Sequence, residues 1–422
     1  MLKQLEGSQG VAQAVALCRP DVVCAYPISP QTHIVEGLGL LVKKGLLKNC
    51  EYINVESEFA AMSVAIGASI AGGRSYTATA SQGLLYMVEA VYNASGLGLP
   101  IVMTVANRAI GAPINIWNDH SDSMSQRDCG WIQLFAETNQ EAVDLHIQAF
   151  KIAESVSLPV MVCMDGFVLT HAFEQMDIPD QEDVDKFLPE YSPRQVLDPD
   201  NPYSVGAMVG PEAFTEVRYL AHRRMLDAVD KIKETAEEWK AAFGRESGGL
   251  VSSYRMEDAE VAFFAMGSVL GTIKDSVDEM RGKGVKVGVV GLKCYRPFPY
   301  AAVREALAGV DGVVVVDRML SAGCGGTLNL DVMKALKGRG KKEYSVIAGL
   351  GGRTITKEQI KKLTDMALAG ELPEDESYFL ALDEALVQTA QERERNEQHS
   401  GPVAEALNRE IARRKIEKGE EI

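Results

Sequence analysis

Long apolar runs are missing from this sequence of 422 residues. None reaches the roughly 18 residues that a membrane-spanning helix needs. The opening segment, MLKQLEGSQGVAQAVALCRP, lacks the basic start and the continuous apolar core of a signal peptide. We therefore predict a cytoplasmic protein that does not interact with a membrane.

Positive charge and paired cysteines are also scarce. The sequence has 43 Lys and Arg residues against 59 Asp and Glu residues, which gives a net charge of -16. This charge disfavours nucleic acid as a partner, because phosphates attract basic surfaces. The seven cysteines are scattered, and none forms a C-x-x-C pair. A disulfide framework, a four-cysteine metal site and an iron–sulfur cluster are therefore not expected in this chain.

Patterns typical of nucleotide binding are incomplete. Glycines 67, 72 and 73 do not follow a strand in the order G-x-G-x-x-G. GCGG at 323–326 begins a helix after a strand, but it has no acid at the distance expected for a dinucleotide site. A nicotinamide-binding enzyme is therefore only our third hypothesis.

Two α/β units are predicted from alternating strand-like and helix-like segments. Short runs rich in β-branched residues and bounded by turn residues predict buried strands. Their alternation with helices is typical of doubly wound parallel sheets. The expected strands are DVVCAYP, YINV, SYTATAS, PIVMTVA and PVMVCMD in the first unit, and AEVAFFAMGS, VKVGVVGLK, DGVVVVDRM and YSVIAGLGG in the second.

Composition divides the chain into four segments. A proline-rich excursion separates the two units, and it is followed by a long helix that we expect from Thr215 to Phe243. The highly charged tail is interpreted as a helix that covers a partner, a solvated helix or a disordered segment. The predicted boundaries are 1–178 for the first unit, 179–257 for the excursion and long helix, 258–370 for the second unit and 371–422 for the helical tail.

Polar residues follow four strands of the first unit. The first strand is followed by YPISPQTH and the second by ESEFAAM. The third is followed by SQG and the fourth by NRAIGAPINIWNDHSD. Since the carboxyl ends of parallel strands meet at one edge of a sheet, these segments should surround one crevice. The residues expected there are Ser29, Glu58, Ser81, Gln82, Arg108, Asn118, Asp119 and His120.

Several of these side chains also have a purely structural interpretation. Glu56 and Glu58 are acids of a kind that a helix start favours. The helix that follows them is so apolar, however, that an acid at its mouth should be partly desolvated, which would raise its pKa and suit it to proton transfer. Arg108 fits either a structural ion pair or the capture of a substrate carboxylate. His120 is more typical of a loop histidine than of a metal ligand, and no metal site is predicted.

Several long motifs, in the same order, resemble the alpha subunit of the pyruvate:ferredoxin oxidoreductase family. Its members are thiamine diphosphate enzymes that oxidatively decarboxylate 2-oxo acids to acyl-CoA. The resemblance covers most of residues 1–365 and implies a pyrimidine-binding domain followed by a domain similar to the C-terminal domain of transketolase. The motifs are AYPISPQTHIVEGL, ESEFAAMSVAIGASIAGGRSYTATASQGL, ANRAIGAPINIWNDHSD, LPVMVCMDGFVLTH, RPFP and GLGGR.

The resemblance also implies roles for individual residues. Glu58, with Glu56 as the alternative, would hydrogen-bond N1′ of the aminopyrimidine, and Arg108 would bind the substrate carboxylate. Ser29 stands where the family commonly has threonine, and its hydroxyl would face the same carboxylate from a turn that prolines stiffen. The other implied contacts are Tyr26, Pro27, Ile28, Ser81 and Gln82 with the cofactor, and Asn118, Asp119 and His120 with the substrate near a subunit interface.

Partners are implied as well. A beta subunit would supply the Gly-Asp-Gly motif for the diphosphate and Mg²⁺, because this sequence contains no such motif. Gamma and ferredoxin-like delta subunits would carry iron–sulfur clusters in a dimer of hetero-oligomers. Coenzyme A would be the co-substrate, and ferredoxin or another acceptor would take the electrons.

The substrate and one alternative function stay open. Pyruvate is favoured, but an aryl substrate such as phenylglyoxylate or a branched-chain 2-oxo acid is compatible with the smaller Ser29. A non-catalytic structural subunit of such a complex is the alternative from a different class. The presence of both Glu58 and Arg108 argues against it.

Overall fold

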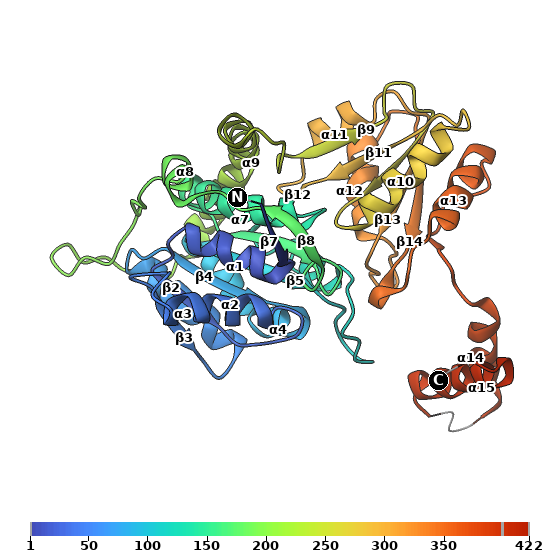
Figure 1. The fold of residues 1–422 in the computed structure, drawn as a ribbon, viewed down its shortest axis with the longest axis horizontal. Coiled ribbons are helices and arrows are strands. Elements are labelled where there is room, and N and C mark those ends of the chain that lie inside the picture. Colours follow the sequence, from blue (N-terminus) through green and yellow to red (C-terminus); the bar gives the residue numbers. More distant parts are fainter. Residues whose placement is uncertain (1, 398–400, 421–422) are drawn as a thin grey trace.

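The computed structural model describes residues 2–397 and 401–420 and contains two α/β units that lie side by side (Figure 1). Within these residues the first unit holds a seven-stranded sheet in the order β12-β6-β7-β5-β4-β2-β3. All of its neighbouring strands are parallel except β12 and β6. The strands are β2 (Val22–Ala25), β3 (Glu51–Asn54), β4 (Ser75–Thr79), β5 (Val102–Asn107), β6 (Ile132–Phe135), β7 (Val160–Asp165) and β12 (Cys294–Arg296).

The central strands of this sheet are buried along their whole length, because helices cover both faces. Every residue of β4, β5 and β7 is buried, as expected for a parallel sheet between two helical layers. One layer consists of α1 (Gly7–Leu17), α2 (Thr32–Lys43), α7 (Asn139–Val156) and α9 (Pro211–Phe243). The other consists of α3 (Glu58–Ile70), α4 (Ser81–Tyr86) and α5 (Val88–Leu97).

The second unit has a six-stranded sheet in the order β15-β14-β13-β10-β11-β9, in which only β9 is antiparallel among the described strands. Helices again pack on both faces, α11 and α12 on one and α10 and α13 on the other. The strands are β9 (Val251–Tyr254), β10 (Val261–Ala265), β11 (Val287–Leu292), β13 (Gly312–Asp317), β14 (Lys342–Ile347) and β15 (Tyr378–Phe379). The helices are α10 (Val269–Arg281), α11 (Tyr300–Ala306), α12 (Thr327–Leu336), the short η1 (Leu350–Gly352) and α13 (Lys357–Ala369).

The two units are interlocked. Strand β12 follows β11 in the second unit, yet it pairs with β6 at the edge of the first sheet. One apolar cluster also runs across the boundary, from Met62 and Phe135 in the first unit to Phe264 and Leu328 in the second. The second unit therefore completes both the sheet and the core of the first.

A buried carboxylate fastens the units together at one point. Asp165, at the end of β7, accepts hydrogen bonds from Arg318 Nη1 at 2.6 Å, the Ser268 backbone N–H at 2.8 Å and His120 Nε2 at 2.8 Å. Burial alone would raise the pKa of Asp165, but the charge of Arg318 and the contact with His120 hold it well below its usual range. The second unit contributes two of these three donors, Arg318 and Ser268.

We expect Asp165→Ala to destabilise the protein by about 3–5 kcal/mol, because it leaves the buried guanidinium of Arg318 without a carboxylate. Differential scanning calorimetry of the full chain should show a melting temperature lower by roughly 5–10 °C. The control is Glu260→Ala, because Glu260 pairs with Lys286 at the surface, where both side chains are about half exposed. Its effect should stay below about 1 kcal/mol, and equal effects of the two variants would contradict the role of Asp165.

The sheet elements expected from the sequence are confirmed, and several others were missed. All nine predicted strands are present, but β6, β9, β12 and β15 were not predicted. An antiparallel pair formed by β1 (Leu2–Glu6) and β8 (Phe173–Asp177) was also missed. The long helix is confirmed and begins four residues earlier than expected, at Pro211, a residue that is common at the first helical position.

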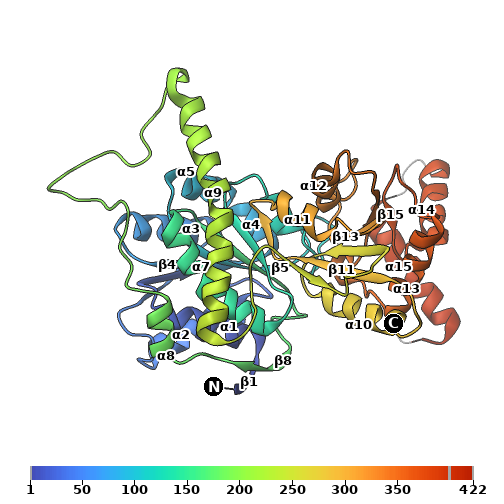
Figure 2. The ribbon, with the colours of Figure 1, turned by 90° about the horizontal axis from the view of Figure 1, so that it is seen from above.

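The excursion and the tail extend from the two units. Residues 190–210 form a long loop that leaves the first unit and returns through α9 (Figure 2), after the short helix α8 (Gln181–Phe187). The described tail contains α14 (Glu384–Asn396) and α15 (Val403–Lys418), in neither of which is any residue buried. The described tail is therefore helical, and its two helices have no buried residue in the isolated chain. None of the described helices is long and apolar enough to cross a membrane.

Candidate active site

The candidate site lies where the strand order of the first sheet reverses. The chain passes from β2 outward to β3 and then resumes at β4 on the other side of β2. Ligands of doubly wound sheets bind at such a point, beyond the carboxyl ends of the strands. Four segments meet there: the turn after β2, the start of α3 after β3, the start of α4 and the end of β5. The structure therefore brings the predicted segments together.

The turn that carries Ser29 is held by hydrogen bonds to its backbone. Arg108 Nη1 donates to the carbonyl of Ser29 at 3.0 Å. The buried side chain of Gln31 donates to the carbonyl of Tyr26 at 3.0 Å and to that of Ala78, on β4, at 2.9 Å. Tyr26, Pro27 and Ser29 are exposed. The turn is thus fixed from below while its side chains face outward.

Glu58 is buried at the first position of α3, and its carboxylate has no protein partner among the described residues. The helix start is already capped by Ser57, whose hydroxyl accepts a hydrogen bond from the Ala60 N–H at 3.2 Å. No hydrogen bond or ion pair from the described part of the chain reaches the Glu58 carboxylate, although the residue is only 8% exposed. Glu56, two residues earlier, is exposed. The two acids therefore differ clearly in environment.

The carboxylate of Glu58 lies directly against the backbone of α4. A Cβ atom at Gly83 would be 2.7 Å from Glu58 Oε1 and 2.5 Å from the hydroxyl oxygen of Thr79, so only glycine fits there. The Thr79 hydroxyl is buried, and no described residue hydrogen-bonds to it. A carboxylate and a hydroxyl thus lie close together with unused hydrogen-bonding capacity.

Asp122 organises the site, although sequence analysis did not single it out. It lies in α6 (Ser121–Ser125), and its fully buried carboxylate accepts hydrogen bonds from the backbone N–H groups of Ser81 and Arg108, each at 2.9 Å, and from Asn107 Nδ2 at 2.8 Å. Burial raises the pKa of Asp122 to about 6, against the effect of these donors. One side chain therefore joins the ends of β4 and β5.

Ser81 and Gln82 occupy the start of α4. Ser81 has a φ of 50°, a conformation that is rare for residues other than glycine. Its hydroxyl donates to the Ala109 carbonyl at 2.5 Å, which together with Asp122 holds this strained backbone in place. Gln82 is partly exposed and donates to the Gly111 carbonyl at 3.2 Å.

Arg108 is a buried cation without an acidic partner among the described residues. Its side chain is 9% exposed and donates only to carbonyl groups, those of Ser29 and Asn115. Asp122 bonds to the backbone of Arg108 and not to its guanidinium. Burial lowers the pKa of Arg108. A guanidinium in this condition favours an anion from outside the chain.

Asn118, Asp119 and His120 are buried between the two units. Asp119 Oδ2 accepts a hydrogen bond from the Gly351 N–H at 3.1 Å, and the backbone N–H of His120 donates to the Arg318 carbonyl at 2.8 Å. The side chain of His120 bonds to Asp165, as described above, and Asn118 lies against Arg318. The structure thus places these three residues in contacts that position the loop carrying Arg108.

Comparison with known proteins connects this geometry to a family. Residues 13–238, more than half of the chain, match the family described as pyruvate flavodoxin/ferredoxin oxidoreductase, thiamine diphosphate-binding. The chain belongs to the pyruvate flavodoxin/ferredoxin oxidoreductase family. Residues 259–360 also match core domain II of pyruvate:ferredoxin oxidoreductase. The first unit is thus a thiamine diphosphate-binding domain of this oxidoreductase family.

Named relatives cover nearly the whole chain. The pyruvate synthase subunit PorA of Methanosarcina barkeri is 46% identical over 91% of this chain and 97% of the relative. PorA of Thermotoga maritima is 44% identical over 90% of this chain and 97% of the relative. The ketoisovalerate oxidoreductase subunit VorA of Pyrococcus abyssi is 40% identical over 86% and 92%. The chain is therefore a subunit of a 2-oxo acid:ferredoxin oxidoreductase.

Solved structures show the same fold at low sequence identity. A 2-oxoglutarate:ferredoxin oxidoreductase from Magnetococcus marinus matches with a TM-score of 0.64 at 18% identity, over 86% of this chain and 65% of that one. A split-gene transketolase matches with a TM-score of 0.53 at 13% identity, over 87% of this chain and 99% of that one. The two oxidoreductase units thus share the arrangement of a transketolase-like chain.

Proposed function

We propose that this chain supplies the pyrimidine-binding half of a thiamine diphosphate site, in which Glu58 shares a proton with N1′ of the cofactor and Arg108 binds the carboxylate of a 2-oxo acid. The observation that carries the proposal is the buried, unpartnered carboxylate of Glu58 at the switch point of the sheet, as the described residues define it. The proposed reaction is the oxidative decarboxylation of pyruvate to acetyl-CoA and CO₂, with electrons passed to ferredoxin.

The residues around Glu58 fit the cofactor. The Glu58 carboxylate and the Thr79 hydroxyl both lie beside Gly83 on α4, and neither has a hydrogen-bond partner among the described residues. Both groups are therefore available to a ring with hydrogen-bonding nitrogens. Bound thiamine diphosphate supplies the electron sink that accepts the electron pair released with CO₂. The part of Glu58 is to hold a proton at N1′, from a residue that is only 8% exposed.

Arg108 and the Ser29 turn would orient the substrate. The guanidinium offers a planar pair of N–H donors to a carboxylate, and this fixes the position of the adjoining ketone carbon. Because Arg108 also holds the Ser29 carbonyl, the turn and the cation form one preorganised unit. The hydroxyl of Ser29, on an exposed residue, is free to approach the same carboxylate.

A partner subunit would complete the site. The relatives are named as subunits, and the segments that carry the candidate site residues also carry exposed apolar side chains that a protein surface could cover. We propose a beta subunit that binds the diphosphate and Mg²⁺, gamma and ferredoxin-like delta subunits with iron–sulfur clusters, and coenzyme A as the co-substrate, in a dimer of hetero-oligomers. The exposed apolar residues are Tyr26, Phe59, Tyr86, Ile114, Ile116 and Trp117.

The substrate can be tested with the assembled complex. We expect kcat/KM for CoA-dependent oxidation to be at least about tenfold higher with pyruvate than with 2-oxoisovalerate, phenylglyoxylate or 2-oxoglutarate, since tenfold corresponds to about 1.4 kcal/mol of discrimination. A higher value for 2-oxoisovalerate would instead support the branched-chain alternative, to which the similarity to VorA also points. No turnover of any of the four acids, with thiamine diphosphate bound, would favour a structural subunit.

A further inference from the structure

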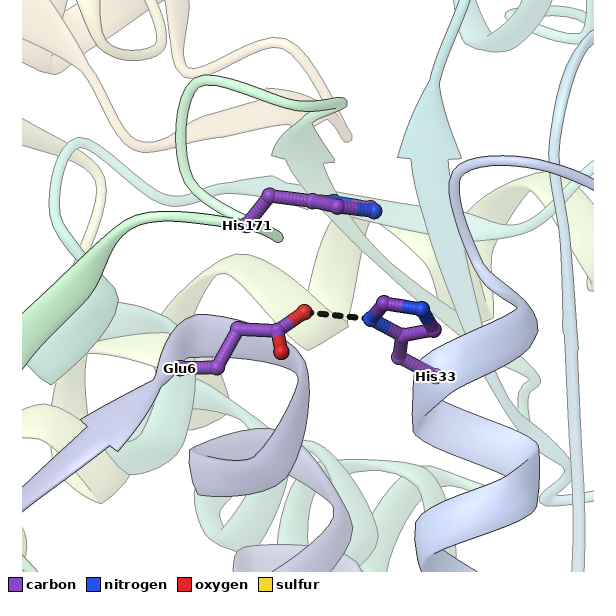
Figure 3. Close-up of side chains that lie close together, drawn as sticks. All are labelled: Glu6, His33 and His171. Carbon is purple, nitrogen blue, oxygen red and sulfur yellow. Dashed lines mark hydrogen bonds and ion pairs between the residues drawn. The ribbon is translucent and has the colours of Figure 1, made fainter.

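Three potential metal ligands from distant parts of the chain converge beside the start of α2 (Figure 3). Glu6 is the last residue of β1, His33 lies in the first turn of α2, and His171 lies in the segment between β7 and β8. One ligand atom of each side chain lies within 4.8 Å of those of the other two. The mechanism proposed above uses none of these residues.

The two imidazoles are oriented by their neighbours. His33 Nδ1 is 2.6 Å from Glu6 Oε1, and the ring centroids of His33 and His171 are 4.7 Å apart. The hydroxyl of Thr170 hydrogen-bonds His171 Nδ1 at 2.7 Å, and this leaves Nε2 of His171 as the ligand atom. A hydrogen bond to the other ring nitrogen is the usual way in which a metal-binding imidazole is held in place.

Charge and access also fit a cation. Glu6 contributes one negative charge. The side chain of His33 is 44% exposed and that of Glu6 is 13% exposed, so an ion can reach the group from solvent.

We propose that Glu6, His33 and His171 bind a divalent transition-metal ion, with Zn²⁺ as the best fit and water in the remaining position. Zn²⁺ binds imidazole nitrogen and carboxylate oxygen at about 2.1 Å, which places the ligand atoms of a tetrahedral site roughly 3.3 Å apart. The distance between Glu6 Oε1 and His33 Nδ1 therefore has to lengthen slightly. The ligand atom of His171 has to move toward the other two by no more than about 1.5 Å. Rotations about the side-chain bonds are sufficient for shifts of this size.

A bound ion would fasten the start of α2 to two segments that are already hydrogen-bonded to each other, since the N–H groups of Gly7 and Ser8 donate to the carbonyls of Ala172 and Thr170. His33 lies four residues beyond Ser29, so the ion would tie the substrate-facing turn to the β1–α1 junction and to the loop after β7. The site is thus a structural support for the active-site turn. Its existence does not depend on the identity of the 2-oxo acid.

The test is a titration of the untagged full-length chain with Co²⁺, followed by its visible d–d absorption, and with Zn²⁺ by calorimetry. All proteins carry Cys324→Ser, because Cys324 is an exposed thiol. We expect one equivalent to bind with a micromolar or lower Kd, and Zn²⁺ to raise the melting temperature. His33→Ala and His171→Ala should each weaken binding at least about tenfold.

The matched control is His222→Ala, because His222 is exposed on α9, far along the chain from the cluster. This variant should bind Co²⁺ and Zn²⁺ as the parent does. Glu6→Gln removes the negative charge at nearly constant side-chain volume and should also weaken binding. His33→Gln replaces His33→Ala if circular dichroism of the alanine variant shows a loss of structure. The proposal is overturned if the parent binds no stoichiometric metal, or if the His33, His171 and Glu6 variants bind it as tightly as the parent.

Discussion

Glu58→Gln should lower kcat of the assembled complex by about 10²–10⁴-fold, the range typical for loss of a proton-transferring side chain. Glutamine has nearly the same shape and fits the same place beside Gly83. It cannot hold an exchangeable acidic proton. Steady-state kinetics with saturating thiamine diphosphate, pyruvate and CoA would measure the change.

Glu56→Gln is the matched control for this experiment. It makes the same chemical change two residues away, at an exposed position. We expect kcat to stay within about twofold of the parent, since surface substitutions away from special features have small effects. Calorimetric titration with thiamine diphosphate would show that both variants still bind the cofactor. If Glu58→Gln kept parental turnover, Glu58 would have no part in the chemistry.

Arg108→Ala should raise KM for the 2-oxo acid by about 100-fold and change kcat much less. Truncating one partner of a buried, charge-assisted pair costs about 2–5 kcal/mol, and each 1.4 kcal/mol corresponds to a factor of about ten. The large cost is expected because the guanidinium is 9% exposed and, among the described residues, donates to carbonyl groups and to no carboxylate. A rise in KM with little change in kcat identifies a binding role.

Two controls separate carboxylate recognition from damage to the turn. Arg108→Lys keeps the charge but not the planar fork, so its KM should lie between those of the parent and the alanine variant. The methyl ester of the 2-oxo acid carries no negative charge, and its KM should be the same for the parent and for Arg108→Ala. If KM for the ester rose as much as KM for the acid, the loss of the hydrogen bond to the Ser29 carbonyl would be the better explanation.

The positions of the site segments could be predicted because the relevant signal is local. Each segment follows an apolar run, and the geometry of parallel sheets brings the ends of such runs together. The choice of Glu58 over Glu56 followed from the family motif, in which a Ser-Glu pair precedes a helix of small residues, and the structure buries Glu58 and exposes Glu56. The assignment of roles to Glu58 and Arg108 stays a prediction until the variants are measured.

Other features could not be predicted because they depend on contacts between distant segments. Asp122 is one of several polar residues in NIWNDHSD, and only the folding of that loop under the ends of β4 and β5 gives it three partners from other elements. Arg318 pairs with Asp165 across 153 positions of the chain. Glu6, His33 and His171 lie in three distant segments. Pairing of β1 with β8 brings Glu6 near His171, and packing of α2 against α1 brings His33 to them.

The exchange of β12 between the units limits how this protein can be dissected. A fragment that stopped at residue 257 would still contain every described helix of the first unit, but the sequence IQLF of β6 would have an unpaired edge. Such an edge is a template for intermolecular pairing, and aggregation would follow. Recombinant pieces and chimaeras should therefore retain residues 294–296, so that boundaries follow strand pairing in space and not the linear order of the sequence.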